Sequence, residues 1–215
     1  MKSLKINFSP AEGDELFCQS KWWGSADLPK DVDYPTIPYE DGDDPLTMVC
    51  QINCADLAAV DTENLLPHEG MLYFFAAIDE YVYKINKDFD MGCDYFNGLN
   101  EWAPETYRVI YVPKVEDAIP NDLTDENGEP YGLPAERITF EVSDDAYLDD
   151  FKLLGLPFYE EIREQYPEHL CLLQIDGNDD WQMQLYDMGM ICFLIRPDDL
   201  KALDFSKVKV YFHSC

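Results

Sequence analysis

An apolar segment with a glutamine near its centre occurs twice in this chain. Gln51 lies within MVCQIN, Met48–Asn53, and Gln174 lies 123 residues later within CLLQID, Cys171–Asp176. Short apolar runs of this kind predict buried strands. A buried amide without hydrogen-bond partners costs ~1–3 kcal/mol, so each glutamine must meet polar groups. We expect the two amides either to bond backbone groups where a strand bends, or to line a cleft between two halves of the chain.

Similar segments precede and follow both glutamine strands in the same order, which predicts an internal duplication. Each half has a first strand, a K-x-x-G motif, a glutamine strand, a strand that starts at glycine, and a closing strand. In the first half these are LKINF (Leu4–Phe8), KWWG (Lys21–Gly24), MVCQIN, GMLYFF from Gly70 and YRVIYV (Tyr107–Val112). In the second half they are RITFEV (Arg137–Val142), KLLG (Lys152–Gly155), CLLQID, GMICFL from Gly189 and VKVYFH (Val208–His213).

The predicted fold class is therefore α+β, with two similar, mostly antiparallel β-sheet halves that lie side by side and carry short helices. Residues 1–112 form the first half and residues 135–215 the second. The segment between them, residues 113–134, contains four prolines and is the expected linker or crossover. Short helices are expected over residues 157–166, where a proline precedes acidic residues, and over residues 197–203.

These segments resemble the YwqG-like family, a bacterial domain of unknown function. In the first half the resemblance rests on SKWWGSADLP, PLTMVCQINCADL and LLPHEGMLYFF; in the second half, where it is closer, on FKLLGLPF, CLLQIDGNDD and DMGMICFLIRPDDLKALDFSKV. It extends from about Lys21 to the end and is weakest over residues 113–134. Trp22 and Trp23 stand where the family usually has a second glycine and an aromatic residue. The resemblance implies a two-part α+β domain and supplies no reaction or catalytic residue.

The charge balance limits the partners of this chain. There are 44 acidic and 15 basic residues, giving a net charge of -29. Such a chain repels nucleic-acid phosphates and anionic membrane surfaces, which both recruit lysine and arginine. We therefore expect no nucleic-acid and no membrane partner, and a basic protein as the charged partner.

The cysteines and the start of the chain predict a cytoplasmic protein with free thiols. Seven cysteines are an odd number, and none forms a C-x-x-C pair. The first residues are too polar for the apolar region of a signal peptide. The longest apolar run, Met71–Ile78, is far shorter than the ~20 residues that cross a bilayer.

No metal or cofactor is predicted. Asp176, Asn178 and Asp180 fall at the first ligand positions of a calcium-binding loop. Trp181 stands where that loop needs glycine, however, so an acidic hairpin turn is favoured over a calcium site. The histidines and cysteines show no zinc-ligand spacing.

Two functions are compatible with these observations. No catalytic motif is present, so we expect a non-catalytic interaction module, of the adaptor or immunity-protein type, with an acidic surface. The alternative is a small-molecule-binding protein or enzyme with a cleft between the halves. The candidate binding residues are Lys21, Trp22, Trp23, Gln51, Lys152, Gln174, Asp176 and Trp181, with tryptophan included because it is enriched at binding hot spots, although it more often packs in cores.

Overall fold

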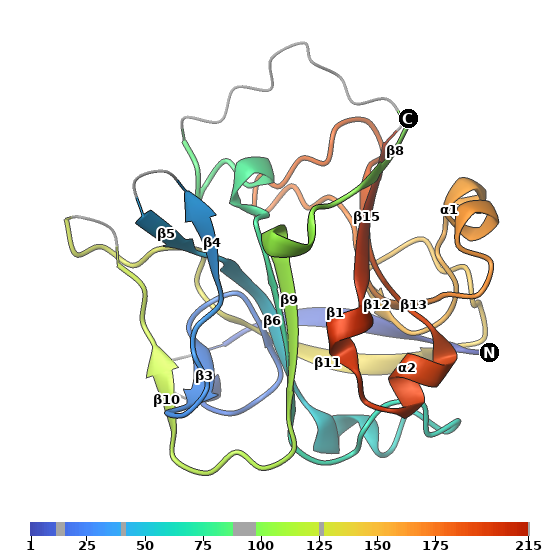
Figure 1. The fold of residues 1–215 in the computed structure, drawn as a ribbon, viewed down its shortest axis with the longest axis horizontal. Helices are drawn as coiled ribbons and strands as arrows, with labels where there is room; N and C mark the ends of the chain where they lie inside the picture. The colour runs from blue at the N-terminus through green and yellow to red at the C-terminus, as the bar shows by residue number, and fades with distance from the viewer. Residues whose placement is uncertain (12–15, 40–41, 88–97, 125–126, 215) are drawn as a thin grey trace.

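The protein is built around one long, curled β-sheet (Figure 1). The computed structural model describes residues 1–11, 16–39, 42–87, 98–124 and 127–214. Within these residues, eleven strands pair antiparallel throughout the sheet. In spatial order they are β8 (Gly98–Glu101), β15 (Lys209–Ser214), β14 (Met190–Ile195), β13 (Leu170–Ile175), β12 (Lys152–Leu153), β1 (Ser3–Pro10), β11 (Glu136–Ser143), β2 (Lys21–Trp22), β6 (Thr47–Asn53), β7 (Met71–Ala76) and β9 (Tyr107–Val112).

Smaller elements lie against this sheet. Two antiparallel ribbons pair β3 (Ala26–Pro29) with β10 (Ala118–Asn121) and β4 (Thr36–Tyr39) with β5 (Gly42–Pro45). The helices are short: α1 (Glu160–Gln165), α2 (Pro197–Lys201), and the 3-10 turns η2 (Cys54–Leu57), η3 (Asp79–Tyr81), η4 (Pro104–Thr106) and η5 (Phe205–Lys207). Both α-helices fall where the sequence predicts them. Within the described ranges, every helix falls short of the length and apolar character needed to cross a membrane.

The predicted fold class, α+β with two similar sheets side by side, is wrong. The described residues form a mostly β structure with one continuous main sheet. The reason lies in β1 and β11, the first strands of the two expected halves. They pair with each other along their full length, from Ser3 opposite Ser143 to Pro10 opposite Glu136. Each also pairs with a strand of the other expected half, β1 with β12 and β11 with β2, so the sheet has no boundary between halves.

Strands β7 and β14 are apolar throughout because both of their faces are buried. In β7, Leu72 and Phe74 pack into the main core inside the curl, whereas Tyr73 and Phe75 pack into a second cluster on the other face. Strand β14 divides its side chains in the same way between the main core and a third cluster. The central strand β1 instead alternates, with Leu4 and Ile6 in the core. The apolar residues therefore recur with a period of two in the central strand β1. In β7 and β14 they form continuous runs, because both faces of these strands are covered.

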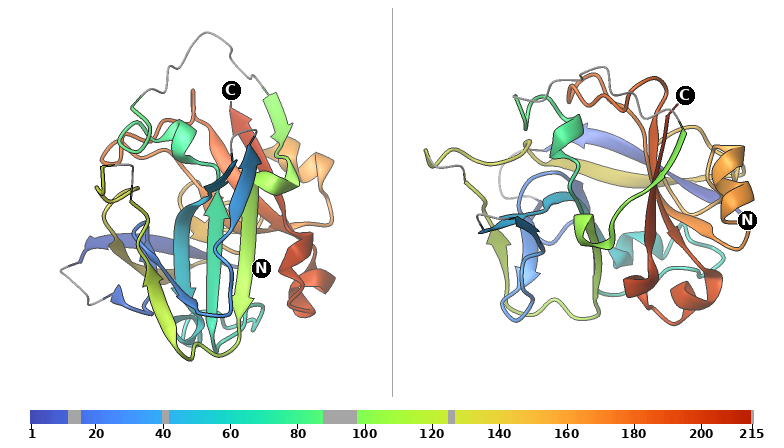
Figure 2. Two further views of the ribbon diagram at one scale, coloured as in Figure 1. Left: turned by 60° about the vertical axis from the view of Figure 1, so that its left-hand side comes forward. Right: turned by 45° about the horizontal axis from the view of Figure 1, so that its top comes forward.

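Two β-bulges contribute to the curl of the sheet, which Figure 2 shows from two further directions. The register of β6 against β7 shifts between Met48 and Cys50, and that of β13 against β14 shifts between Cys171 and Leu173. A bulge bends its strand and increases the local twist. Each bulge comes just before the glutamine of its strand, so both amides lie where a strand bends.

Candidate functional site

The first lysine–glutamine pair, Lys21 and Gln51, lies on β2 and β6. The two residues are opposite each other in register and both are buried. The Gln51 amide oxygen accepts the backbone N–H of Asp27 at 3.0 Å, and its Nε2 donates to the Gln19 carbonyl at 3.0 Å. The amide therefore ties the chain on both sides of Lys21 to β6. This is the arrangement expected of a glutamine that bonds backbone groups.

Asp27 provides the negative charge of this site. Its Oδ2 lies 2.8 Å from Lys21 Nζ, and the two side chains are 1% and 6% exposed. The same oxygen accepts Nε2 of Gln51 at 2.6 Å and the backbone N–H of Cys18 at 2.9 Å. A buried charge is tolerated only when it is paired and hydrogen-bonded, and both conditions are met here. Burial, reinforced by the charge of Asp27, raises the pKa of the neighbouring Cys18 thiol.

The K-x-x-G motif makes the turn that brings Asp27 back to Lys21. Trp23 and Gly24 both have left-handed backbones, with φ of 58° and 75°. A Cβ on Gly24 would lie 2.7 Å from the Ala135 side chain, so this position requires glycine. The Trp23 N–H donates to the carbonyl of Val49, inside the bulge of β6, at 2.9 Å. The turn is thus fixed by the neighbouring strand β6 and by the chain at Ala135, which packs against Gly24.

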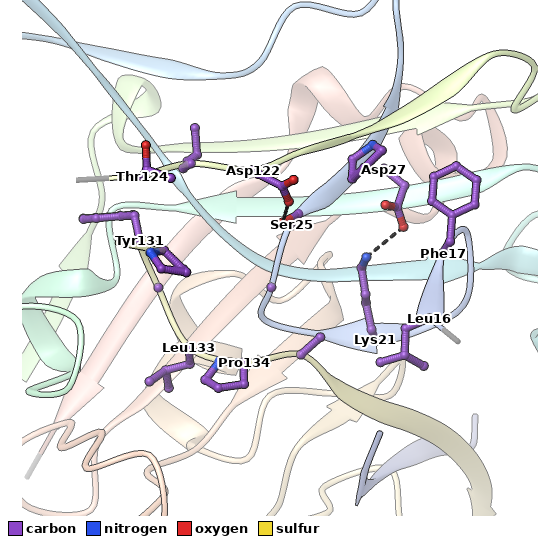
Figure 3. Close-up of a pocket in the computed structure, with 16 residues that line it drawn as sticks. Leu16, Phe17, Lys21, Ser25, Asp27, Asp122, Thr124, Tyr131, Leu133 and Pro134 are labelled. Atoms are coloured by element: carbon purple, nitrogen blue, oxygen red, sulfur yellow. Dashed lines mark hydrogen bonds and ion pairs between the residues drawn. The ribbon is translucent and has the colours of Figure 1, made fainter. Parts of the chain in front are cut away.

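A cleft of about 960 Å³ lies against this turn, and we name it the Lys21 cleft (Figure 3). One wall comes from residues 16–27 and the other from residues 120–135. Its lining is mostly apolar and rich in proline: Leu16, Phe17, Lys21, Gly24, Ser25, Asp27, Pro120, Asp122, Leu123, Thr124, Pro130, Tyr131, Gly132, Leu133, Pro134 and Ala135. The Ser25 hydroxyl donates to the Asp122 carboxylate, which joins the two walls. Phe17 and Tyr131 stand at the rim, 46% and 37% exposed.

Lys21 is the one basic side chain among the described residues that line this cleft. Its ammonium donates to Asp27 and has no second hydrogen-bond partner within the described part of the chain. An ammonium has three N–H donors. Two of its donors therefore have no partner among the described residues and are available, as far as these residues go, to a group that enters the cleft.

The second lysine–glutamine pair, Lys152 and Gln174, lies on β12 and β13 and is also opposite in register. The Gln174 amide oxygen accepts the backbone N–H of Phe158 at 3.1 Å, and its Nε2 donates to the carbonyls of Leu148 and Asp150 at 3.0 Å. Four strands separate β13 from β6 in the sheet, and the two amides share no hydrogen-bond partner. The hypothesis that both line one cleft is therefore wrong.

Lys152 is held by backbone alone. Its ammonium donates to the carbonyls of Leu148 at 2.8 Å, Leu156 at 2.9 Å and Ala146 at 3.4 Å. These three bonds use all of its donors. Burial lowers the pKa of this ammonium. Lys152 therefore has a structural task here, and Lys21 is the lysine that faces a cleft.

The three candidate tryptophans lie together in the main core. Trp22 is 0%, Trp23 1% and Trp181 4% exposed. Trp22 stacks on Trp181 with ring centroids 5.9 Å apart, and Trp23 meets Trp181 edge to face at 5.5 Å. Phe8 and Phe151 complete the cluster. These indoles pack the core and present no face to solvent.

Asp176 and its neighbours form a turn, as the hairpin interpretation predicts. The Asp176 carboxylate accepts the N–H of Gly177, the Asn178 side chain accepts the N–H of Trp181, and Asn178 bridges to Met183. Burial raises the pKa of Asp176, and the charges of Asp149 and Asp150 add to this effect. Among the described residues, no three histidine, cysteine or carboxylate side chains gather in a way that could hold a metal ion.

Sequence reasoning missed Asp27 and the second wall of the cleft. Asp27 lies between Ala26 and Leu28, so an acid inside an apolar segment was the available signal for a buried charge. The prolines of residues 113–134 indicate a connecting segment, but nothing in them shows that residues 120–134 fold back against the turn after β2. That placement depends on the pairing of β10 with β3.

The fold and the site together define a mostly β protein whose single long sheet carries a lateral cleft at a buried lysine–aspartate pair. The model of a family described as a domain of unknown function (DUF1963) matches residues 20–164 and, in a second match, residues 139–215. The chain belongs to this family. No curated protein matches it.

Proposed function

We propose that the protein is a non-catalytic binding module and that its ligand occupies the Lys21 cleft. The observation that carries this proposal is the position of Lys21, which is buried, is paired with Asp27, lines a cleft of about 960 Å³, and has two donors without a partner among the described residues. A fixed ammonium in an apolar surrounding is suited to orienting an acceptor group of a ligand.

The same contacts argue against catalysis. A nucleophilic or basic lysine needs its nitrogen free to react, whereas Lys21 Nζ lies 2.8 Å from the Asp27 carboxylate. The described lining contains no histidine and no cysteine, the usual partners in proton transfer and covalent chemistry. Its serine, Ser25, donates a hydrogen bond to Asp122, and no histidine lines the described part of the cleft to act as its general base.

The small-molecule alternative has one observation in its favour, the cleft volume, which falls within the range of small-ligand sites. The location differs from that expected, because the cleft lies between residues 16–27 and 120–135 and not between the two expected halves. We further propose that the protein acts in the cytoplasm, that it is a YwqG-like member of its family, and that its partner is basic. The acidic excess of the chain supports the last of these.

The test is affinity capture from a native cell extract, with mass spectrometry of proteins and small molecules that stay bound. The cleft variant is Phe17→Ala, since this side chain lies at the rim and its loss does not open the core. The matched control is Tyr83→Ala, an exposed aromatic that lines none of the hollows described here. We expect a ligand that wild type and Tyr83→Ala retain and Phe17→Ala loses. Equal retention by all three proteins, or chemical conversion of the bound ligand, would contradict the proposal.

A further inference from the structure

The Lys21 cleft continues into two further hollows. Leu123, Thr124 and Tyr131 line both the cleft and a second hollow of about 280 Å³. Ile37 and Ala77 line both the second hollow and a third, of about 260 Å³, which ends at Trp102. The three hollows thus adjoin one another in a row from Lys21 past Tyr131 to Trp102, and we call this row the groove. An elongated groove of this kind suits a chain molecule better than a compact one.

The charge along this groove that is not already in an ion pair among the described residues is negative. Two of its acids are already in ion pairs, Asp27 with Lys21 and Glu101 with Lys209. Four more line it without an ion pair among the described residues, and Lys21 is the one base in the described lining. The four acids are Asp122, Asp44, Asp79 and Glu80.

We propose that the occupant of the groove is an extended segment of a partner protein in which basic side chains alternate with apolar ones. This inference rests on the proposed binding function and names the ligand class. An extended segment places successive side chains on opposite sides, so one row can reach the carboxylates while the other meets the apolar lining. Lys21 then donates to a backbone carbonyl of the segment. The carboxylates give the partner its charge complementarity and steer its approach.

The probe is a short fluorescein-labelled peptide of alternating lysine and leucine, with alternating glutamate–leucine and serine–leucine peptides beside it. Fluorescence anisotropy is measured on the full chain at low and high salt. We expect the lysine–leucine peptide to bind most tightly and the glutamate–leucine peptide to show no binding. Affinity for the lysine–leucine peptide should fall as salt screens the carboxylates.

A chain of net charge -29 attracts any basic peptide. The deciding control is therefore a variant that has the same net charge as the groove variant. The groove variant is Asp44→Asn with Glu80→Gln, and the control is Glu164→Gln with Asp198→Asn, which neutralises two exposed acids outside the groove. We expect the groove variant to bind the peptide about fivefold to tenfold more weakly than wild type and the control to stay within about twofold. Equal weakening of both variants would show that binding follows net charge, and would overturn the inference.

A second pair of variants tests the apolar half of the proposal. Tyr131→Ala removes the ring shared by the cleft and the second hollow, and Tyr83→Ala is its control. We expect weaker peptide binding in the first variant only, and equal binding in both contradicts the inference. A cleft-dependent small molecule from the extract, with no peptide binding, would overturn the peptide inference and leave the binding function standing. If neither a cleft-dependent ligand nor peptide binding is detected, both the peptide inference and the proposed binding function are overturned.

Discussion

The two lysine–glutamine pairs show how one backbone arrangement can serve two purposes. In each pair the glutamine accepts an N–H six residues after the lysine, from Asp27 or from Phe158. In each it also donates to a carbonyl two residues before the lysine, that of Gln19 or Asp150. The K-x-x-G turns match as well, since Leu154 and Gly155 have φ of 60° and 91°.

The difference lies in what meets the ammonium. Lys152 donates to three backbone carbonyls, whereas Lys21 donates to the carboxylate of Asp27. Position 158, which corresponds to Asp27 in the bonding to glutamine, is a phenylalanine. The difference between Asp27 and Phe158 at this position therefore distinguishes an ion pair that faces a cleft from a lysine with structural contacts alone.

The largest effect is expected from Asp27→Asn, which leaves the Lys21 ammonium buried without its counter-ion. Breaking a buried ion pair from one side costs ~3–5 kcal/mol. Urea unfolding of the variant at neutral pH measures this loss. The double variant Lys21→Met, Asp27→Leu removes both charges and should recover part of the stability, since Gln51 Nε2 and the Cys18 N–H still lose their bonds to Asp27. A double variant as unstable as Asp27→Asn would show that the ion pair itself is not the source of the loss.

The next largest effect is expected when each of the two lysines is replaced by methionine. Lys21→Met leaves a buried carboxylate, so we expect it to lower the free energy of unfolding by about 3 kcal/mol. Lys152→Met leaves only carbonyls without a donor, so we expect a loss of about 1–2 kcal/mol. Equal losses in the same urea series would mean that Asp27 does not distinguish the two sites.

The glutamines should behave alike. Gln51→Leu and Gln174→Leu each remove three hydrogen bonds to nitrogen or oxygen atoms, so we expect each to cost roughly 2–3 kcal/mol. Thermal unfolding of the two variants beside wild type measures this. If one substitution leaves the stability unchanged and the other lowers it severely, the two glutamines do not have equivalent structural roles.

The smallest effect is a gain, from Asp176→Asn. The folded pKa of Asp176 is raised, chiefly by burial, so the folded state binds this proton more tightly than the unfolded chain. The stability that protonation provides is complete below the unfolded pKa and is lost as pH rises through the folded pKa. The variant should therefore be slightly more stable than wild type at pH 7. Thermal unfolding from pH 7 downwards should show the gain shrinking; a gain independent of pH would assign it to another cause.

Much of the local structure could be predicted from the sequence, because strands and turns depend on neighbouring residues. The strands at Gln51 and Gln174, the two α-helices and the turn at Asp176 lie where their patterns place them. The arrangement of those strands could not be predicted, because β1 pairs with residues more than 120 positions away and no local pattern encodes the partner. The cleft depends on the same kind of long-range contact, the pairing of β10 with β3.

The position of β1 in the middle of the sheet has a consequence for the order of folding. Both neighbours of this strand, β11 and β12, belong to the last eighty residues of the chain. During synthesis the first strand emerges early and must wait, unpaired, until most of the chain has been made. Long waits of this kind slow folding and leave strand edges open to association with other chains. We therefore expect a fusion that delays release of the C-terminal residues to lower the yield of folded protein. A fusion that causes an equal delay before Met1 should lower this yield less.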